Sequence, residues 1–289
     1  MLFRLFTPFF ALLLSASAFG GEGAVAATQP AQGVSGYRYL DVGSWIVIES
    51  HVRTNGTAAT MKRRIQIMAD PATHERSLQE SRWVTDAFVP TGEAQVLARP
   101  DRRSFDQLGL TADSTAPDEV VTIGGKRYVC SVATYLFTSQ DDGRSTRVTL
   151  WRDKSGTTKL PPRWVSINHK EIPLPQDALQ ADVNVEGPNI STRGQRRIIS
   201  MASPLRVSGQ TCNCLVEGTQ TQGTSNGKAL SLTVREWLCH DLPGERLRTV
   251  TAMSCGPMRV ESDVTVLDFH VARLESSVQA LPTTDLCAK

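Results

Sequence analysis

The chain has 289 residues, a formal net charge of +2, 40% hydrophobic residues and 21% charged residues. This length and apolar content support a sizeable core, which excludes a disordered chain and a small scaffold held together mainly by disulfides. Lysine and arginine are scattered, as in the run Arg193–Arg197 with the sequence RGQRR. We interpret them as solvated strand faces and expect no nucleic-acid partner.

The first residues are typical of a secretory signal peptide. Arg4 is followed by an apolar run from Leu5 to Leu14 and then by small residues. This run is shorter than a membrane-spanning helix, and Ala24-Val25-Ala26 matches the small-residue pattern before a cleavage site. We expect residues 1–26 to be removed after Ala26, which predicts a secreted or periplasmic chain with no transmembrane segment in its mature form.

Hydrophobic alternation predicts a mainly β protein with little helix. Residues 44–53 and 60–68 flank Thr-Asn-Gly-Thr, and residues 120–123 and 126–137 flank Gly124-Gly125, so both pairs are expected to form hairpins. Helix is expected only around 71–84. The remaining strands are predicted at 146–152, 163–167, 195–201, 228–238, 245–253 and 263–274.

An internal repeat organises the chain. Residues 121–132 align without a gap on residues 205–216 at an offset of 84, and each copy continues into a strand with a tryptophan and then a Leu-Pro turn. We expect two tandem antiparallel β units, forming a curved sheet or an incomplete barrel. The repeat-equivalent structural residues are Gly125 and Gly209, Trp151 and Trp237, and Pro161 and Pro243.

The repeat predicts domain boundaries. The first β unit covers 27–169 with a long loop insertion at 91–119, and the second, cysteine-rich unit covers 190–289. Residues 170–189 contain three prolines and few apolar residues, which indicates a linker or crossover.

The segments VGSW, GGKRYVC and SGQTCNC, and the strands that end in LPPRW and LPGERL, resemble uncharacterised secreted β-repeat proteins of planctomycete-type bacteria. Those proteins share a Gly-x-Trp-Val opening, a Gly-Lys-x-Tyr-x-Cys strand and a Trp-Ser strand with a Val-Pro-Gly turn. The resemblance implies a fold and no established activity. The layout also looks remotely like the incomplete barrels of periplasmic lipoprotein carriers, which enclose acyl chains.

Six cysteines, an even number in an exported chain, favour disulfides, although their pairing stays open among fifteen combinations. If Pro243-Gly244 centres a two-residue hairpin loop, Cys239 lies opposite Arg248 and Cys255 opposite Leu232, so these two cysteines do not bridge that ladder. The candidates are Cys130, Cys212, Cys214, Cys239, Cys255 and Cys287.

A metal or thiol-redox site at Cys212, Cys214, Cys239 and His240 is the sharper alternative. Cys-x-Cys fits zinc spacing poorly, and His240 faces away from Cys239 on a strand, so we expect no metal and no cofactor. The histidines are dispersed and no catalytic motif is present, which argues against an enzyme. The five tryptophans are interpreted as packing residues rather than ligand-stacking ones: Trp45, Trp83, Trp151, Trp164 and Trp237.

The sequence therefore predicts an exported, non-enzymatic protein that binds an apolar ligand, an envelope component or a protein partner. A structural or surface-assembly module without a ligand is the first alternative, and the metal or thiol-redox protein is the second. The ligand-binding residues and the oligomeric state stay open.

Overall fold

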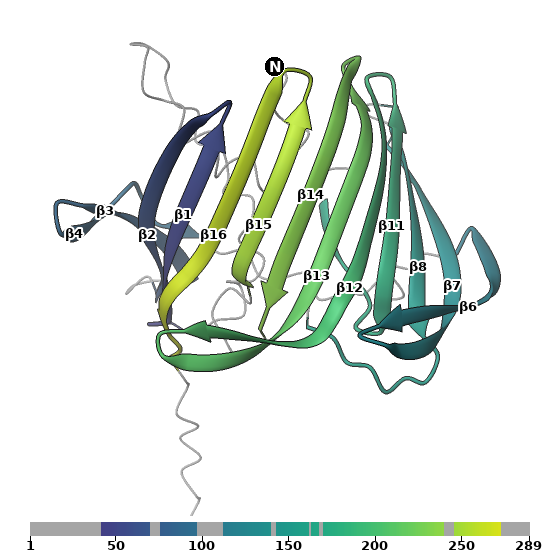
Figure 1. Ribbon diagram of the computed structural model, residues 1–289, viewed down its shortest axis with the longest axis horizontal. Helices are drawn as coiled ribbons and strands as arrows, with labels where there is room; N and C mark the ends of the chain where they lie inside the picture. The colour runs from purple at the N-terminus through teal and green to yellow at the C-terminus, as the bar shows by residue number, and fades with distance from the viewer. Residues whose placement is uncertain are drawn as a thin grey trace, which may run out of the picture.

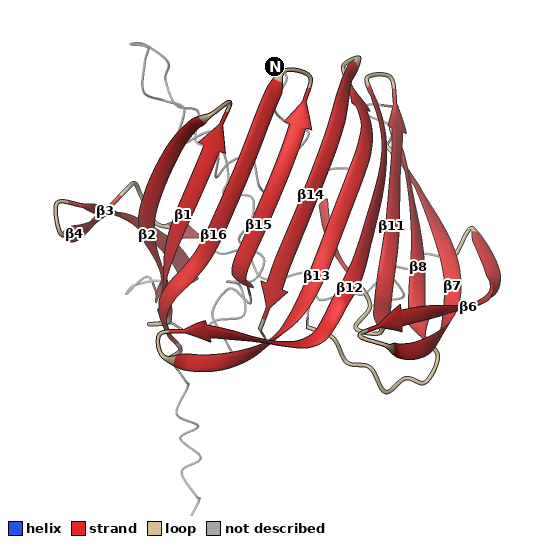
Figure 2. Ribbon diagram, viewed as in Figure 1, coloured by secondary structure: helices blue, strands red, loops and turns tan. Residues whose placement is uncertain are grey.

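The computed structural model describes residues 42–69, 76–96, 112–139, 143–161, 163–167, 170–239 and 246–272. All regular elements within these ranges are β-strands, and fourteen of them form one curved antiparallel sheet (Figures 1 and 2). The predicted fold class is confirmed. The predicted signal peptide, residues 1–26, lies outside the described residues.

Strand bounds in the first half are β1 (Trp45–Thr54), β2 (Thr57–Ala69), β3 (Arg76–Val84), β4 (Ala87–Pro90), β5 (Gln95–Val96), β6 (Ser114–Ile123), β7 (Lys126–Thr138) and β8 (Ser145–Asp153). Those that follow are β9 (Trp164–Ile167), β10 (Lys170–Pro173), β11 (Ala178–Gly187), β12 (Ile190–Val207), β13 (Gln210–Ser225), β14 (Lys228–Leu238), β15 (Arg246–Cys255) and β16 (Met258–His270).

The sheet order is β4-β3-β2-β1-β16-β15-β14-β13-β12-β11-β8-β7-β6, with β5 paired to β3, while β9 and β10 form a separate pair. Most neighbours are consecutive in the chain, as expected of a sheet built from hairpins. The exception with the longest span is β1 beside β16, whose ladder runs from Trp45–His270 to Thr54–Val260. Figure 1 shows this junction where the purple and yellow strands meet. Both ends of the described chain therefore lie inside the sheet.

Both predicted hairpins are confirmed. Asn55 and Gly56 join β1 to β2 with φ of 47° and 90°, and Gly124 and Gly125 join β6 to β7 with φ of 55° and 83°. A two-residue turn with positive φ at both positions matches the twist of the strands on either side, which explains the Asn-Gly and Gly-Gly pairs.

The hairpins β6–β7 and β12–β13 share one register, 84 residues apart. At the turn, the two ladders end at Ile123–Lys126 and at Val207–Gln210. These two pairs are 84 residues apart, which is also the offset at which residues 121–132 align with residues 205–216. We infer that the hairpins are copies of one β unit. Both ladders also shift register at equivalent places, between Ala116 and Glu119 in β6 and between Ser200 and Ser203 in β12.

The helix expected around 71–84 is wrong for its described part. Residues 76–84 form β3, which pairs with β2 from Ala69–Arg76 to Arg63–Arg82. Leu78 is buried in the core while its neighbours are half-buried, which is the alternation of an outer strand. The open edge of β2 offers a complete ladder to this segment, and that pairing overrides its weak helical pattern.

Two other expectations differ in their local structure. Residues 170–189, expected to be a linker or crossover, hold β10 and β11, and β11 lies in the sheet between β8 and β12. Its modest hydrophobicity arises because one of its faces is partly exposed. In the tract 91–119 the described ends form β5 and the start of β6, and residues 97–111 lie outside the described part.

The core lies on one face of the sheet. Ile46, Ile65, Leu78 and Leu247 belong to its largest cluster, under β1, β2, β3, β15 and β16. Under β7, β8 and β11 the cover is the segment with β9 and β10, whose Val165, Ile167 and Leu174 pack on Val148 and Leu150. One face of the sheet is thus buried by the chain's own side chains.

A substitution at Gly223 of β13 can test how closely the backbones of β12 and β13 approach each other. Its φ is 154°, and a Cβ there would lie 2.0 Å from the carbonyl oxygen of Ser191. Gly223→Ala should lower the free energy of unfolding by on the order of 2 kcal/mol or more, because the two backbones must separate. Denaturant unfolding measures this. Gly92→Ala, with open space around it, is the control, and equal stability of the two variants would contradict the register.

Candidate functional site

Strand alternation gives the sheet an inner and an outer face. On β14, Leu230, Val234 and Glu236 are buried, whereas Thr233 and Arg235 between them are exposed. We name the buried side the inner face and the exposed side the outer face. Both faces carry charged residues, but in different environments.

Five charged side chains alternate in sign on the inner face. Glu217 of β13 and Glu236 of β14 lie directly opposite each other, and Arg196 of β12 pairs with both. Arg163, which precedes β9, also donates to the carbonyl oxygen of Ala178. The chain of ion pairs is Arg163–Glu217 at 2.9 Å, Arg196–Glu217 at 2.5 Å, Arg196–Glu236 at 3.6 Å and Arg246–Glu236 at 2.9 Å.

Glu217 is the centre of this network, with its side chain 1% exposed. Burial alone raises the pKa of a carboxyl group, but attraction to Arg196 and Arg163 and their hydrogen bonds outweigh it. The pKa of Glu217 is therefore lowered below its ordinary value. The carboxylate stays charged and ties the segment before β9 to the centre of the sheet.

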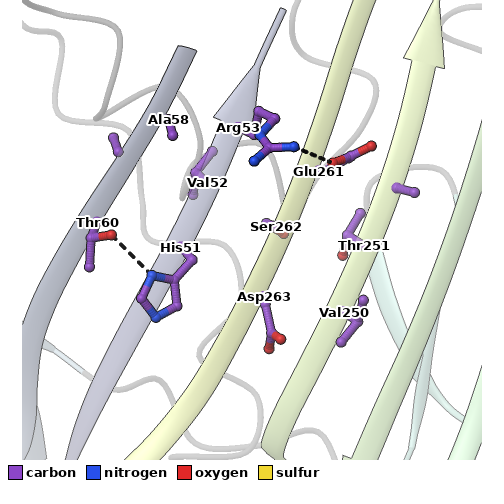
Figure 3. A pocket seen from close by; sticks show the side chains of 12 residues that line it. His51, Val52, Arg53, Ala58, Thr60, Val250, Thr251, Glu261, Ser262 and Asp263 are labelled. Carbon is purple, nitrogen blue, oxygen red and sulfur yellow. Dashed lines mark hydrogen bonds and ion pairs between the residues drawn. The ribbon is translucent and has the colours of Figure 1, made fainter. Parts of the chain in front are cut away.

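The outer face has a hollow of about 530 Å³ over β2, β1, β16 and β15 (Figure 3). Alanine, serine and threonine side chains form the floor of the hollow, and charged side chains surround it. Register pairs His51 with both Thr60 and Asp263, and Arg53 with both Ala58 and Glu261, so these groups share one face. The hollow is lined by His51, Val52, Arg53, Ala58, Ala59, Thr60, Val250, Thr251, Ala252, Glu261, Ser262 and Asp263.

Polar contacts hold the rim of the hollow in place. His51 Nδ1 is 3.0 Å from the Thr60 hydroxyl and Nε2 is 2.8 Å from Glu49 Oε2. Arg248 donates to both carboxylate oxygens of Asp263, at 3.0 and 2.6 Å. These hydrogen bonds, together with nearby positive charge, hold the pKa of Asp263 below its ordinary range.

Thr60, His51 and Glu49 form a chain of contacts in which a hydroxyl touches an imidazole and the imidazole touches a carboxylate, as in sites of nucleophilic catalysis. Nucleophilic catalysis also needs donors aimed at the developing oxyanion. Along β1 the backbone is paired with β2 on one side and β16 on the other, so its N–H groups are engaged in ladders.

The expected disulfides are wrong for the five described cysteines, because no two of them are bridged: Cys130, Cys212, Cys214, Cys239 and Cys255. Cys212, Cys214 and Cys239 belong to one core cluster, whereas Cys130 and Cys255 lie in two other clusters, each without a second cysteine. The thiol of Cys214 is hydrogen-bonded to that of Cys239, and this contact together with burial raises the pKa of Cys214. Burial also raises the pKa of Cys130. Cys287 lies outside the described residues.

The expected register around Cys239 is also shifted by two residues. Arg248 pairs with Trp237, and Cys255 pairs with Leu230. The connection is longer than the expected two-residue loop because β14 ends at Leu238 and β15 begins at Arg246. Pro243 and His240 lie in this connection, outside the described residues.

The alternative metal site has no described counterpart. Among the described ranges, no group of three or more His, Cys, Asp or Glu side chains is arranged to hold a metal ion. The raised pKa of Cys214 also makes this thiol a poor nucleophile and a poor metal ligand, because the thiolate is the reactive form.

The repeat-equivalent residues occupy related positions. Gly125 and Gly209 have φ of 83° and 79° in the two hairpin turns, and Trp151 and Trp237 each pair with a valine of the preceding strand. The Trp151 indole N–H donates to Glu119 at 2.9 Å, and the Arg248 guanidinium lies 5.3 Å above the Trp237 ring. Pro161 is buried beside Leu160.

The sequence did not reveal the inner-face network or the hollow. The one available signal for Glu217 is a glutamate directly after the apolar run Cys214-Leu215-Val216, where an unpaired charge would be costly. Its partner Arg163 is 54 residues away, and no local pattern connects the two. The hollow depends on β1 lying beside β16, which is a purely tertiary contact.

No protein-family model matches this sequence, and no curated protein matches it. The solved structures that resemble it include two from bacteria. An exported protein with a YmcC-like fold from Bacteroides fragilis has 7% identity and a TM-score of 0.29, over 80% of this chain and 97% of that chain. The hypothetical lipoprotein YmcC from Escherichia coli K12 has 11% identity and a TM-score of 0.25, over 76% and 87%. At these TM-scores neither likeness carries an argument about function. Within the described residues no helix is long and apolar enough to cross a membrane.

Glu217→Gln tests the inner-face network. It should lower the free energy of unfolding at neutral pH by about 3–5 kcal/mol, because buried Arg163 and Arg196 lose their shared carboxylate. The stabilisation from Glu217 is fully present above its unfolded pKa and is lost as the pH falls through its lowered folded pKa. The difference between native chain and variant should therefore shrink in acid.

Urea unfolding over a range of pH measures both effects. Exposed Glu93 provides the control, since Glu93→Gln should leave stability almost unchanged. A difference between native chain and Glu217→Gln that does not vary with pH would contradict the charged state of Glu217.

Proposed function

We propose that this chain is an exported, non-enzymatic binding protein that docks an envelope component or a partner protein on its outer face. The observation that carries this proposal is the hollow between β2 and β15, with charged groups of both signs around its rim. Such a surface suits a partner of complementary charge, because opposed charges steer the encounter and set its register.

The rim is ordered before anything binds. Arg248 and Asp263 form a two-pronged hydrogen-bonded pair, and His51 is held between Glu49 and Thr60. Side chains that are already immobilised lose less rotamer entropy on association than free ones. Arg53 and Glu261, whose closest atoms are 4.0 Å apart, form a looser pair that can re-form with a partner's charges.

The outer face is favoured over an apolar-ligand site inside the sheet. Within the described part, the inner face is packed with the chain's own side chains, among them Leu150 and Leu179 at 0% exposure. The Arg163–Glu217 pair fills its centre with charge. An acyl chain there would have to displace packed residues and leave charges unpaired, at a high cost in free energy.

An assembly role without a ligand is the second candidate, and the edge strand β6 favours it. Among the described strands, β6 pairs with β7 alone, so its other edge is a candidate for pairing with a strand of another chain. Val120 and Val129, 48% and 52% exposed, pair on the hairpin it forms with β7. Pro117 and Asp118 at the register shift oppose continuous pairing along this edge.

Export is tested by the mature N-terminus. Expressed in its native host, the protein should be recovered from outside the cytoplasm with Ala27 as its first residue, because Ala24-Val25-Ala26 provides the cleavage motif. Intact-mass measurement and N-terminal sequencing determine this. A chain recovered in the cytoplasm with Met1 still present would contradict export.

Ala252→Arg tests the hollow. Ala252 lies opposite Glu261 on the outer face, and an arginine there should fill the space without disturbing the core. In cross-linking of host envelope extracts followed by mass spectrometry, the native chain should retain a defined component, and Ala252→Arg should reduce this about tenfold or more.

The matched control is Ala229→Arg, which adds the same side chain to an exposed position of β14 away from the hollow. It should capture the same component as the native chain. Equal capture by Ala252→Arg and Ala229→Arg, or capture of nothing by the native chain, would overturn the proposal. Thermal unfolding of all three chains checks that the variants are folded.

A further inference from the structure

The outer face of β8, β11, β12, β13 and β14 carries three parallel rows of side chains, separate from the hollow. Register places one residue of each strand in each row, and Figure 1 shows the five strands side by side. We name these fifteen positions the arginine grid. Its rows are Arg147-Asn184-Arg193-Gln222-Ser231, Thr149-Asp182-Gln195-Gln220-Thr233 and Trp151-Gln180-Arg197-Gly218-Arg235.

Four arginines dominate the charge of the grid: Arg147, Arg193, Arg197 and Arg235. All four are exposed, and none makes an ion pair with another described residue. Asp182 is the one carboxyl group among the fifteen positions, and its side chain already accepts a hydrogen bond from Gln180 at 3.3 Å. The grid is therefore net positive, and its guanidinium groups are free to meet an anion.

The arginines are regularly spaced. Arg147 and Arg193 are two strands apart in one row, as are Arg197 and Arg235 in another. Strand geometry puts about 10 Å between the members of each pair and about 14 Å between Arg193 and Arg197 along β12. Such spacing is comparable to that of charged groups carried on alternate sugars of a linear polymer.

The remaining positions are mainly amides and hydroxyls. Gln195, Gln220, Gln222 and Thr233 are exposed and lie between the arginines. Amide groups both donate and accept hydrogen bonds, which matches the hydroxyl groups of a sugar. The one aromatic ring of the grid belongs to Trp151, which is half-buried and donates to Glu119, so the grid has no row of exposed rings on which unpaired bases could stack.

We propose that the arginine grid binds an acidic polysaccharide. The guanidinium groups of the grid pair with the carboxylates of the polymer, and the glutamine side chains between the arginines contact its hydroxyl groups. Guanidinium pairs with carboxylates in a two-pronged geometry, so each arginine contributes direction as well as charge. This site needs no occupant in the hollow, and the two proposals stand or fall separately.

Binding of the purified mature chain to immobilised alginate tests the grid, with neutral dextran, poly-L-glutamate and double-stranded DNA as comparison polymers. Alginate should bind, and its affinity should fall as salt rises. Poly-L-glutamate, which lacks hydroxyls, and DNA should bind more weakly, and dextran should not bind. Arg193→Gln combined with Arg197→Gln should weaken alginate binding about tenfold or more, since two charge-assisted contacts are lost.

The matched control removes two exposed arginines outside the grid, Arg127 of β7 and Arg259 of β16. Arg127→Gln with Arg259→Gln makes the same change in net charge and should change alginate affinity less than twofold. Equal weakening by both double variants would show a response to net charge alone and overturn the proposal. Absence of alginate binding, or tighter binding of DNA or poly-L-glutamate than of alginate, would also overturn it.

Discussion

The ion pairs of Glu217 determine how the two faces of the sheet are used. A carboxylate 1% exposed needs positive partners, and it finds Arg196 on the adjacent strand and Arg163 on the segment that crosses the inner face. Arg163 also binds the backbone of β11. These contacts tie the segment with β9 and β10 onto the sheet, where its apolar residues cover β8 and β11. The chain's own side chains thus close this part of the inner face.

The same constraint divides the run Arg193–Arg197 between two roles. Strand alternation turns Arg196 inward to Glu217 and leaves Arg193 and Arg197 outward on β12. A one-residue change of register would exchange these faces and bury two arginines without partners. The buried network thus also fixes the register that creates the arginine grid. Core structure and proposed recognition surface are two consequences of one strand alignment.

Two regions of the outer face differ in chemistry. Around the hollow, charges are paired in advance, as in Arg248 with Asp263, which favours a shaped partner with its own charges in fixed places. On the grid, the four arginines make no ion pair with a described residue and lie among amides and hydroxyls, which favours a repeating polyanion. The two proposals therefore assign different partners to different parts of one broad sheet. Free, buried thiols at Cys130 and Cys214 fit a packing role in this sheet.

Local sequence determined the hairpins, the β fold class and the repeat. Asn55-Gly56 and Gly124-Gly125 select their turns through backbone geometry alone, and apolar alternation identifies most strands without knowledge of their partners. Tertiary structure decided the rest. Residues 76–84 became a strand because β2 offered an open edge, and β11 joined the sheet despite its polar composition. The hollow exists because β1 lies beside β16, and the grid exists because five strands align arginines that are scattered in the sequence. Turns are encoded by neighbouring residues, whereas surfaces arise from contacts between residues far apart in the chain, which no local pattern records.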